Sequence, residues 1–109
     1  MRNVKELESD IVRAICDYLE LRPSILFWRQ NVAPAFDWKT NSFRRMPKHA
    51  LKGVPDIIVI KAGQFIGLEV KREKGKLSLD QVAFRVRVEA AGAKYYVVRS
   101  IDEVKELGL

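Results

Sequence analysis

The stretch DIIVIKAGQFIGLEVK, residues 56–71, decides the fold. Two runs rich in β-branched and aromatic residues, 56–60 and 65–70, flank the short polar segment Lys61-Ala62-Gly63-Gln64, and this pattern predicts a β-hairpin. With a tight turn at Ala62 and Gly63, the facing pairs are Ile60 with Phe65, Ile58 with Gly67, and Asp56 with Glu69. The pattern therefore places two carboxylates side by side at the open end of the hairpin.

Charge gathers on one face of this open end. Directly opposed residues have Cβ atoms about 4.5–5.5 Å apart, and like charges at that distance destabilise a sheet unless something positive lies between them. Side chains alternate along a strand, so Lys71 shares the face of Glu69 while Val70 turns into the core. Asp56, Glu69 and Lys71 are either a functional cluster or ordinary charges on an exposed sheet face.

The composition limits what such a cluster can bind. The 109 residues include 20 Lys and Arg against 14 Asp and Glu, a net charge of +6, with one Cys and one His. A cysteine-rich or histidine-rich metal site is therefore excluded, and any metal must be held by oxygen. The positive excess favours nucleic acid as a partner over a membrane, because the chain has no long basic amphipathic helix and no apolar span. We expect one soluble domain over residues 1–109, located in the cytoplasm.

The segments before the hairpin predict a helix, a strand and a loop. Apolar residues at three- and four-residue spacings predict an amphipathic helix over 4–21. The apolar run ILFW predicts a strand over 24–31 that is buried on both faces. Residues 32–53 show no period, which indicates a loop, and a loop of that length in a small domain is usually functional or mobile.

The segments after the hairpin predict a helix, a strand and a last short helix. Ser78 and Gln81 form a capping box that opens the first of these helices. The apolar face of this helix consists of Leu79, Val82, Ala83, Val86 and Ala90. A strand over 95–98 follows, and Ser100 with Glu103 repeats the capping pattern. The predicted order is α-β-β-β-α-β-α, an α/β sandwich.

Glu8 is the unusual residue of the first helix. On a helical wheel it falls inside the apolar arc, whereas Glu6, Asp10 and Asp17 fall outside. An ionised glutamate that faces a core needs a partner. Three interpretations are open: a side chain that reaches solvent from a frayed first turn, a salt bridge to Lys71, or a divalent metal shared with the two hairpin carboxylates.

These residues match a known signature. Gly53-Val54-Pro55-Asp56 and the later Glu69-Val70-Lys71 resemble the P-D…(D/E)-x-K motif of the restriction-endonuclease-like nucleases. The acidic first helix and the Leu77-Ser78-x-x-Gln81 helix opening narrow this resemblance to the VRR-NUC (virus-type replication-repair nuclease) domain. The resemblance runs from about Glu8 to Val104, and it implies a restriction-endonuclease-like core, α-β-β-β-α-β with a short C-terminal helix.

The resemblance also implies roles for single residues. It implies a Mg²⁺- or Mn²⁺-dependent phosphodiesterase in which Glu8, Asp56, Glu69 and the Val70 carbonyl bind metal. Asp56, Glu69 and Lys71 would be catalytic, with Gln81 near the site, although its capping role alone accounts for Gln81. Whether Lys71 acts as a base or stabilises negative charge is left open by the sequence.

The expected partner is DNA, contacted through basic residues beside this site. The candidates for phosphate contact are Arg44, Arg45, Lys48, Lys52, Arg72, Lys74 and Lys76. VRR-NUC domains of this size resemble phage-type enzymes that resolve branched DNA, which would place a phage-encoded protein in the host cytoplasm. We expect a homodimer that acts on four-way (Holliday) junctions, with aromatic residues such as Trp28 and Trp38 at an interface. The alternatives are a monomeric flap or nicking nuclease and a binding module of the same fold that does not cut.

Overall fold

A computed structural model describes residues 7–30, 36–37, 39, 42–43 and 47–109, with the backbone alone at 36–37 and 42–43. The elements in chain order are α1 (Glu8–Glu20), β1 (Ile25–Arg29), β2 (Phe36–Asp37), β3 (Ser42–Phe43), β4 (Ile57–Lys61), β5 (Gln64–Val70), α2 (Leu79–Ala90), β6 (Lys94–Val98) and α3 (Ile101–Glu106). Apart from the two-residue strands β2 and β3, which form a small ladder within the predicted loop, this is the predicted order. None of the described helices is long and apolar enough to cross a membrane.

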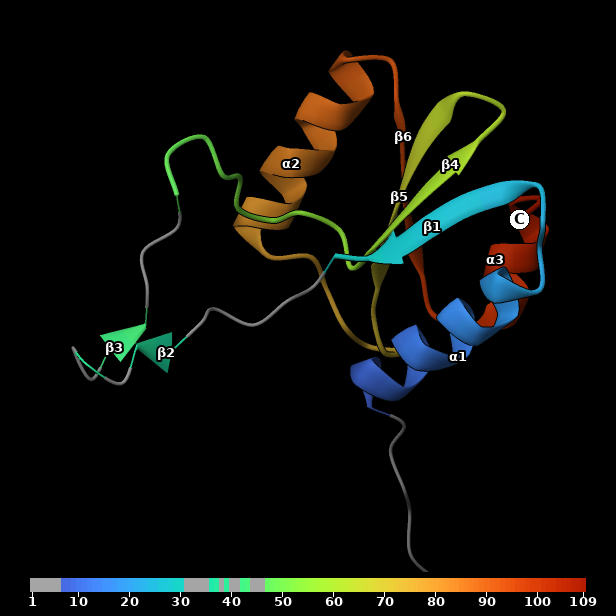
Figure 1. Ribbon diagram of the computed structural model, residues 1–109, viewed down its shortest axis with the longest axis horizontal. Helices are drawn as coiled ribbons and strands as arrows, with labels where there is room; N and C mark the ends of the chain where they lie inside the picture. Colours follow the sequence, from blue (N-terminus) through green and yellow to red (C-terminus); the bar gives the residue numbers. More distant parts are fainter. Residues whose placement is uncertain (1–6, 31–35, 38, 40–41, 44–46) are drawn as a thin grey trace, which may run out of the picture.

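The sheet has the strand order β1-β4-β5-β6, with α1 and α3 on one side of it and α2 on the other (Figure 1). β4 and β5 pair antiparallel in the predicted register, with Ile60 opposite Phe65 and Ile58 opposite Gly67. The turn residues Ala62 and Gly63 both have positive φ, 50° and 77°, as in the type I′ turns that suit the twist of a hairpin. β5 and β6 run parallel, as a right-handed connection through α2 allows.

The core fills the space between the sheet and the helices α1 and α3. Alternate residues of β4 and β5 point into it, and α1 contributes side chains at helical spacing. The fully buried members include Ile15, Leu19, Ile57, Val59, Leu68, Val70 and Val104. This packing fixes the end of β5 that carries Glu69, because Leu68 and Val70 on either side of it are both buried.

The prediction that the first strand is buried on both faces is wrong. Ile25 and Phe27 pack toward the core, whereas Leu26 is 64% exposed and Trp28 is 41% exposed. The physical reason is the position of the strand: β1 lies at the edge of the sheet, and α2 contacts β6 at the opposite edge. The continuous apolar run therefore belongs to a strand that is covered on one face only.

α2 presents to the sheet the side opposite to its apolar face. Leu79 is 89% exposed, Val86 is 61% exposed and Val82 is 43% exposed, whereas Val88 on the other side is buried. The sheet beneath α2 carries Glu69 and Tyr95. Glu69 accepts a hydrogen bond from the Gln81 amide, and the Tyr95 ring lies beside the Phe84 ring and the Arg85 guanidinium. The side of α2 that faces the sheet is therefore the side that carries these contacts.

Candidate active site

The open end of the β4–β5 hairpin brings the predicted charged residues together. Asp56 directly precedes β4, and its Oδ2 accepts a hydrogen bond of 2.8 Å from the Val70 N–H. Glu69 is only 2% exposed, and the Nζ of Lys71 lies 3.8 Å from its Oε1. The Lys71 side chain is 11% exposed, so this ion pair is largely screened from water. The strand alternation inferred from the sequence thus describes the arrangement of these three residues.

Burial and a second carboxylate change the acidity of Glu69. Burial is the main cause that raises its pKa from 4.5 to about 8, the negative charge of Asp56 is the second, and Lys71 opposes both. Glu69 Oε2 is buried and has no hydrogen-bond partner among the described residues. A buried carboxylate that has one unsatisfied oxygen and lies next to another carboxylate is unfavourable on its own. Binding a cation there lowers the free energy of the site.

Gln81 performs two tasks with one amide group. Its Oε1 accepts a hydrogen bond of 2.8 Å from the Ser78 N–H, which completes the predicted capping box. Its Nε2 donates a hydrogen bond of 2.8 Å to Glu69 Oε1. The helix cap and the contact with the carboxylate were alternatives at the sequence level, and the structure combines them. The start of α2 therefore positions Glu69.

Glu8 stands at the first turn of α1, at the margin of this cluster. Its Oε2 accepts a hydrogen bond of 3.4 Å from the Arg72 N–H and lies 4.0 Å from the Arg72 Nε. Its side chain is 41% exposed, so it is less buried than its position on the wheel indicated. The salt bridge that Glu8 makes is with Arg72, whereas Lys71 pairs with Glu69.

The basic segment after β5 is held in place by Arg99. The Nη1 of Arg99 donates to the carbonyl oxygens of Arg72, at 2.6 Å, and Gly75, at 3.2 Å. Arg72, Lys74 and Lys76 are exposed on this segment, beside the carboxylates. Lys48 and Lys52 are exposed on the segment that leads to Asp56, and Arg44, Arg45 and Trp38 lie outside the described residues.

Tyr95 joins the site although sequence reasoning placed it only in a buried strand. It lies opposite Gly67 in the parallel ladder, on the face of Glu69, and its hydroxyl is buried with no hydrogen-bond partner in the part of the chain that the structure describes. The Arg85 guanidinium lies 5.7 Å from the centre of its ring. Burial raises the pKa of Tyr95, and the charge of Glu69 raises it further. The alternation of side chains along β6 places Tyr95 on one face of the sheet. Only the pairing register of β5 with β6 shows that this is the face of Glu69.

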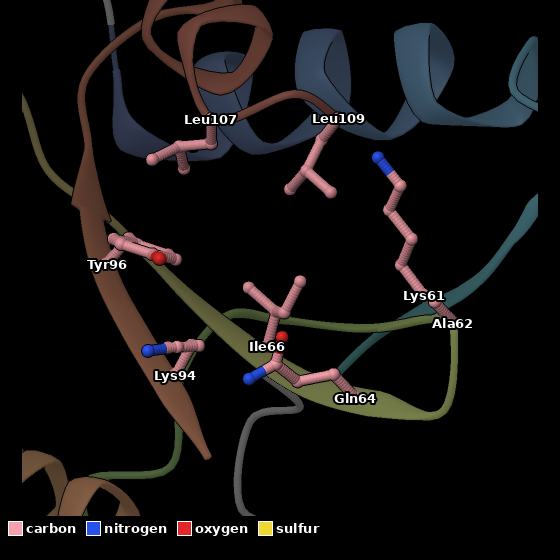
Figure 2. A pocket seen from close by; sticks show the side chains of 8 residues that line it. All are labelled: Lys61, Ala62, Gln64, Ile66, Lys94, Tyr96, Leu107 and Leu109. Carbon is pink, nitrogen blue, oxygen red and sulfur yellow. The ribbon is translucent and has the colours of Figure 1, made fainter. Parts of the chain in front are cut away.

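A cavity of about 270 Å³ lies elsewhere, at the far end of the sheet (Figure 2). It is lined by the turn of the hairpin, by β6 and by the end of the chain, with Lys61, Lys94 and Tyr96 among its residues. Lys61 already donates a hydrogen bond of 2.6 Å to the Gly108 carbonyl. Of the predicted site residues that the structure describes, none borders this cavity.

The donor set can be tested for its fit to a divalent metal. Among the residues that the structure describes, no group of three or more His, Cys, Asp or Glu side chains is close enough to share a metal. Asp56 and Glu69 do lie together, with one buried oxygen unsatisfied. Carboxylate oxygens are the donors that Mg²⁺ and Mn²⁺ prefer, so this pair fits such an ion.

Comparisons with solved structures include a likeness over nearly the whole chain. A solved structure described as "VRR_NUC domain" superposes with a TM-score of 0.62 over 94% of this chain and 95% of that chain, at 22% sequence identity. No family model matches the sequence, and no curated protein matches it. The fold of this chain is therefore that of a VRR_NUC domain, as the resemblance implied.

Proposed function

We propose that this protein is a nuclease that hydrolyses phosphodiester bonds in DNA with the help of Mg²⁺ or Mn²⁺. The observation that carries the proposal is the contact set Asp56, Glu69, Lys71 and Gln81, built at one end of a sheet with a VRR_NUC-like fold. A binding module has no use for a buried pair of carboxylates facing a polyanion, because the pair repels phosphate unless a cation neutralises it.

In this proposal each residue of the candidate site has its own task. Asp56 and Glu69 would hold the cation, with the Val70 carbonyl as a further oxygen donor. Glu8, which stands apart from this pair and contacts Arg72 in the structure, would have to leave Arg72 to join them. A divalent cation held there supplies charge that stabilises the transition state of hydrolysis and makes a nearby water more acidic. Lys71 directs its ammonium at the same place, where it donates hydrogen bonds to a phosphate oxygen or to the attacking water. Gln81 keeps Glu69 in position.

The preferred substrate is branched DNA, cut by a homodimer. A single domain has one active centre, so two strands are cut in one encounter only when two copies act together. A four-way junction has approximate twofold symmetry that matches such a dimer. The exposed side chains of Arg72, Lys74 and Lys76 beside the carboxylates suit contacts with the phosphate backbone.

The direct experiment is a cleavage assay on duplex, flap, splayed-arm and four-way-junction DNA with Mg²⁺, Mn²⁺ or excess EDTA. We expect cutting only with a divalent cation and fastest on the junction. Asp56→Asn and Lys71→Ala should each abolish cutting while the protein stays folded. Cleavage in EDTA, or near wild-type rates in folded Asp56→Asn, contradicts the proposal, and binding without any cutting favours the non-cutting module.

Glu8 has its own test, because its present partner is Arg72. If Glu8 binds metal, Glu8→Gln should raise the metal concentration needed for half-maximal activity about tenfold and leave metal-free stability nearly unchanged. Arg72→Ala is the matched control, since it removes the ion pair and keeps the carboxylate. A Glu8→Gln variant with normal metal dependence and lower stability assigns Glu8 to the salt bridge alone.

A further inference from the structure

The outer side of α2 is an apolar surface that no described element covers. It consists of Leu79, Val82, Ala83, Val86 and Ala90, all exposed, and we call it the α2 stripe. The positions recur at three- and four-residue spacings, so they form one line along the three turns of the helix. The stripe lies opposite the buried Val88. Figure 1 shows α2 on the side of the sheet away from α1 and α3, with the coil that leads to β4 passing beside its first turn.

Two of the charges beside the α2 stripe are placed symmetrically, whereas Arg85 and Glu89 on the other flank pair with each other. Asp80 and Arg87 are seven residues apart, which is close to two turns, so both lie on the same flank, about 90° from the centre of the stripe. Neither has an ion-pair partner in the described part of the chain. The point midway between them lies within about 1 Å, along the helix axis, of the centre of the stripe.

This symmetry makes the surface complementary to itself. When two identical helices pair antiparallel about a twofold axis, a given flank of one lies on the same side as that flank of the other, and their ends are exchanged. Asp80 of one copy then lies beside Arg87 of the other, twice, while the apolar positions meet between them. Parallel pairing would instead set Asp80 against the opposite flank.

We propose that the α2 stripe is the contact surface for a second copy of this chain, paired antiparallel about a twofold axis. The inference rests on the homodimer of the proposed function, but not on its chemistry. Gln81 stands at the start of α2, so the two active centres lie at opposite ends of the paired helices, which are about 18 Å long. A contact of three helical turns is small for a specific interface, so the dimer dissociates at micromolar concentrations.

The test measures mass by analytical ultracentrifugation from about 1 to about 100 µM, in EDTA and without DNA, so its outcome is independent of nuclease activity. The wild type should change from monomer to dimer over this range. Arg87→Asp and Asp80→Arg should each weaken the dimer about tenfold or more. The double variant Asp80→Arg/Arg87→Asp should recover most of the affinity, because the exchanged charges again meet their opposites.

Apolar contact is tested separately with Val86→Lys, which should abolish the dimer while the helix content and the thermal midpoint stay close to wild type. Leu21→Lys is the control, because Leu21 is 78% exposed and lies at the end of α1, away from the stripe. Arg87→Asp should keep the rate of single-strand nicking per protomer and lose paired cutting of junctions. A wild type that stays monomeric, a dimer indifferent to Val86→Lys, or a double variant that fails to recover each overturns the proposal.

Discussion

Among single residues, Glu69 has the most strongly perturbed carboxyl group, because its burial disfavours the charged form. Its pKa is about 8 in the folded chain against an ordinary 4.5, mainly because of burial and then because of Asp56. The folded protein thus holds a proton between these pH values that the unfolded chain releases. Stability linked to Glu69 is therefore full below about pH 4.5 and is lost as pH rises through about 8.

Glu69→Gln isolates this contribution. In metal-free buffer, the wild type should lose stability relative to the variant between pH 4.5 and pH 8, by at most about 5 kcal/mol. Urea unfolding of both proteins at several pH values measures the difference. A difference that does not change with pH means that Glu69 is ionised throughout, and that the pair with Lys71 outweighs burial.

Tyr95 offers a second test at the same scale, because its buried hydroxyl has no hydrogen-bond partner within residues 7–30 and 47–109. Tyr95→Phe should stabilise the metal-free protein by about 1 kcal/mol, since it removes an unsatisfied polar group and keeps the ring. Tyr18→Phe is the matched control, because the Tyr18 hydroxyl donates a hydrogen bond of 2.7 Å to the Leu109 carbonyl. The control should destabilise by a similar amount, and a loss in Tyr95→Phe instead would reveal a partner for its hydroxyl. Thermal unfolding measures both.

Among the elements, α2 depends on how closely the preceding segment approaches it. Gly53 has φ +77°, and a Cβ there would lie 2.2 Å from the Asp80 carbonyl oxygen and 2.8 Å from the Gln81 nitrogen. Glycine is required for both reasons, the conformation and the space. The segment that delivers Asp56 is thereby packed against the start of the helix that delivers Gln81.

Gly53→Ala should therefore lower stability by about 2–4 kcal/mol, through backbone strain and displacement of α2. Gly63→Ala separates the two causes, because Gly63 has the same φ of +77° with nothing within 4 Å of an added Cβ. The control should cost only about 1 kcal/mol. Equal losses of thermal stability in the two variants would show that the close contact with Asp80 costs nothing.

For the whole molecule, we expect the net charge of +6 and its placement to govern the proposed encounter with DNA. In an inactive Asp56→Asn background, Lys74→Ala/Lys76→Ala should lower the slope of log binding constant against log salt by about 1.8, which corresponds to two phosphate contacts. Lys94→Ala/Lys105→Ala removes the same charge from exposed lysines away from the site and should leave the slope nearly unchanged. Equal changes in both variants contradict a DNA surface beside the carboxylates.

The arrangement of the candidate site was largely predictable because its parts are local. Two residues separate the hairpin strands, so the turn sets the register up to Ile57 opposite Leu68, which brings the adjoining Asp56 and Glu69 together. Strand alternation adds Lys71. The capping box likewise fixes the start of α2 within four residues. Patterns of this kind depend on backbone geometry over short distances, which the sequence carries directly.

Only the tertiary structure decided which surfaces meet. Periodicity marks an apolar stripe on α2 and an apolar run in β1, but it cannot say what lies opposite them. The stripe faces outward and Trp28 is exposed, because α2 packs over β6 and gives its polar side to Glu69 and Tyr95. The salt bridge of Glu8 with Arg72, and not with Lys71, depends on the same packing. The sequence by itself determined which groups form the candidate site, whereas long-range packing determined their partners, since pairing distant segments depends on all the elements at once.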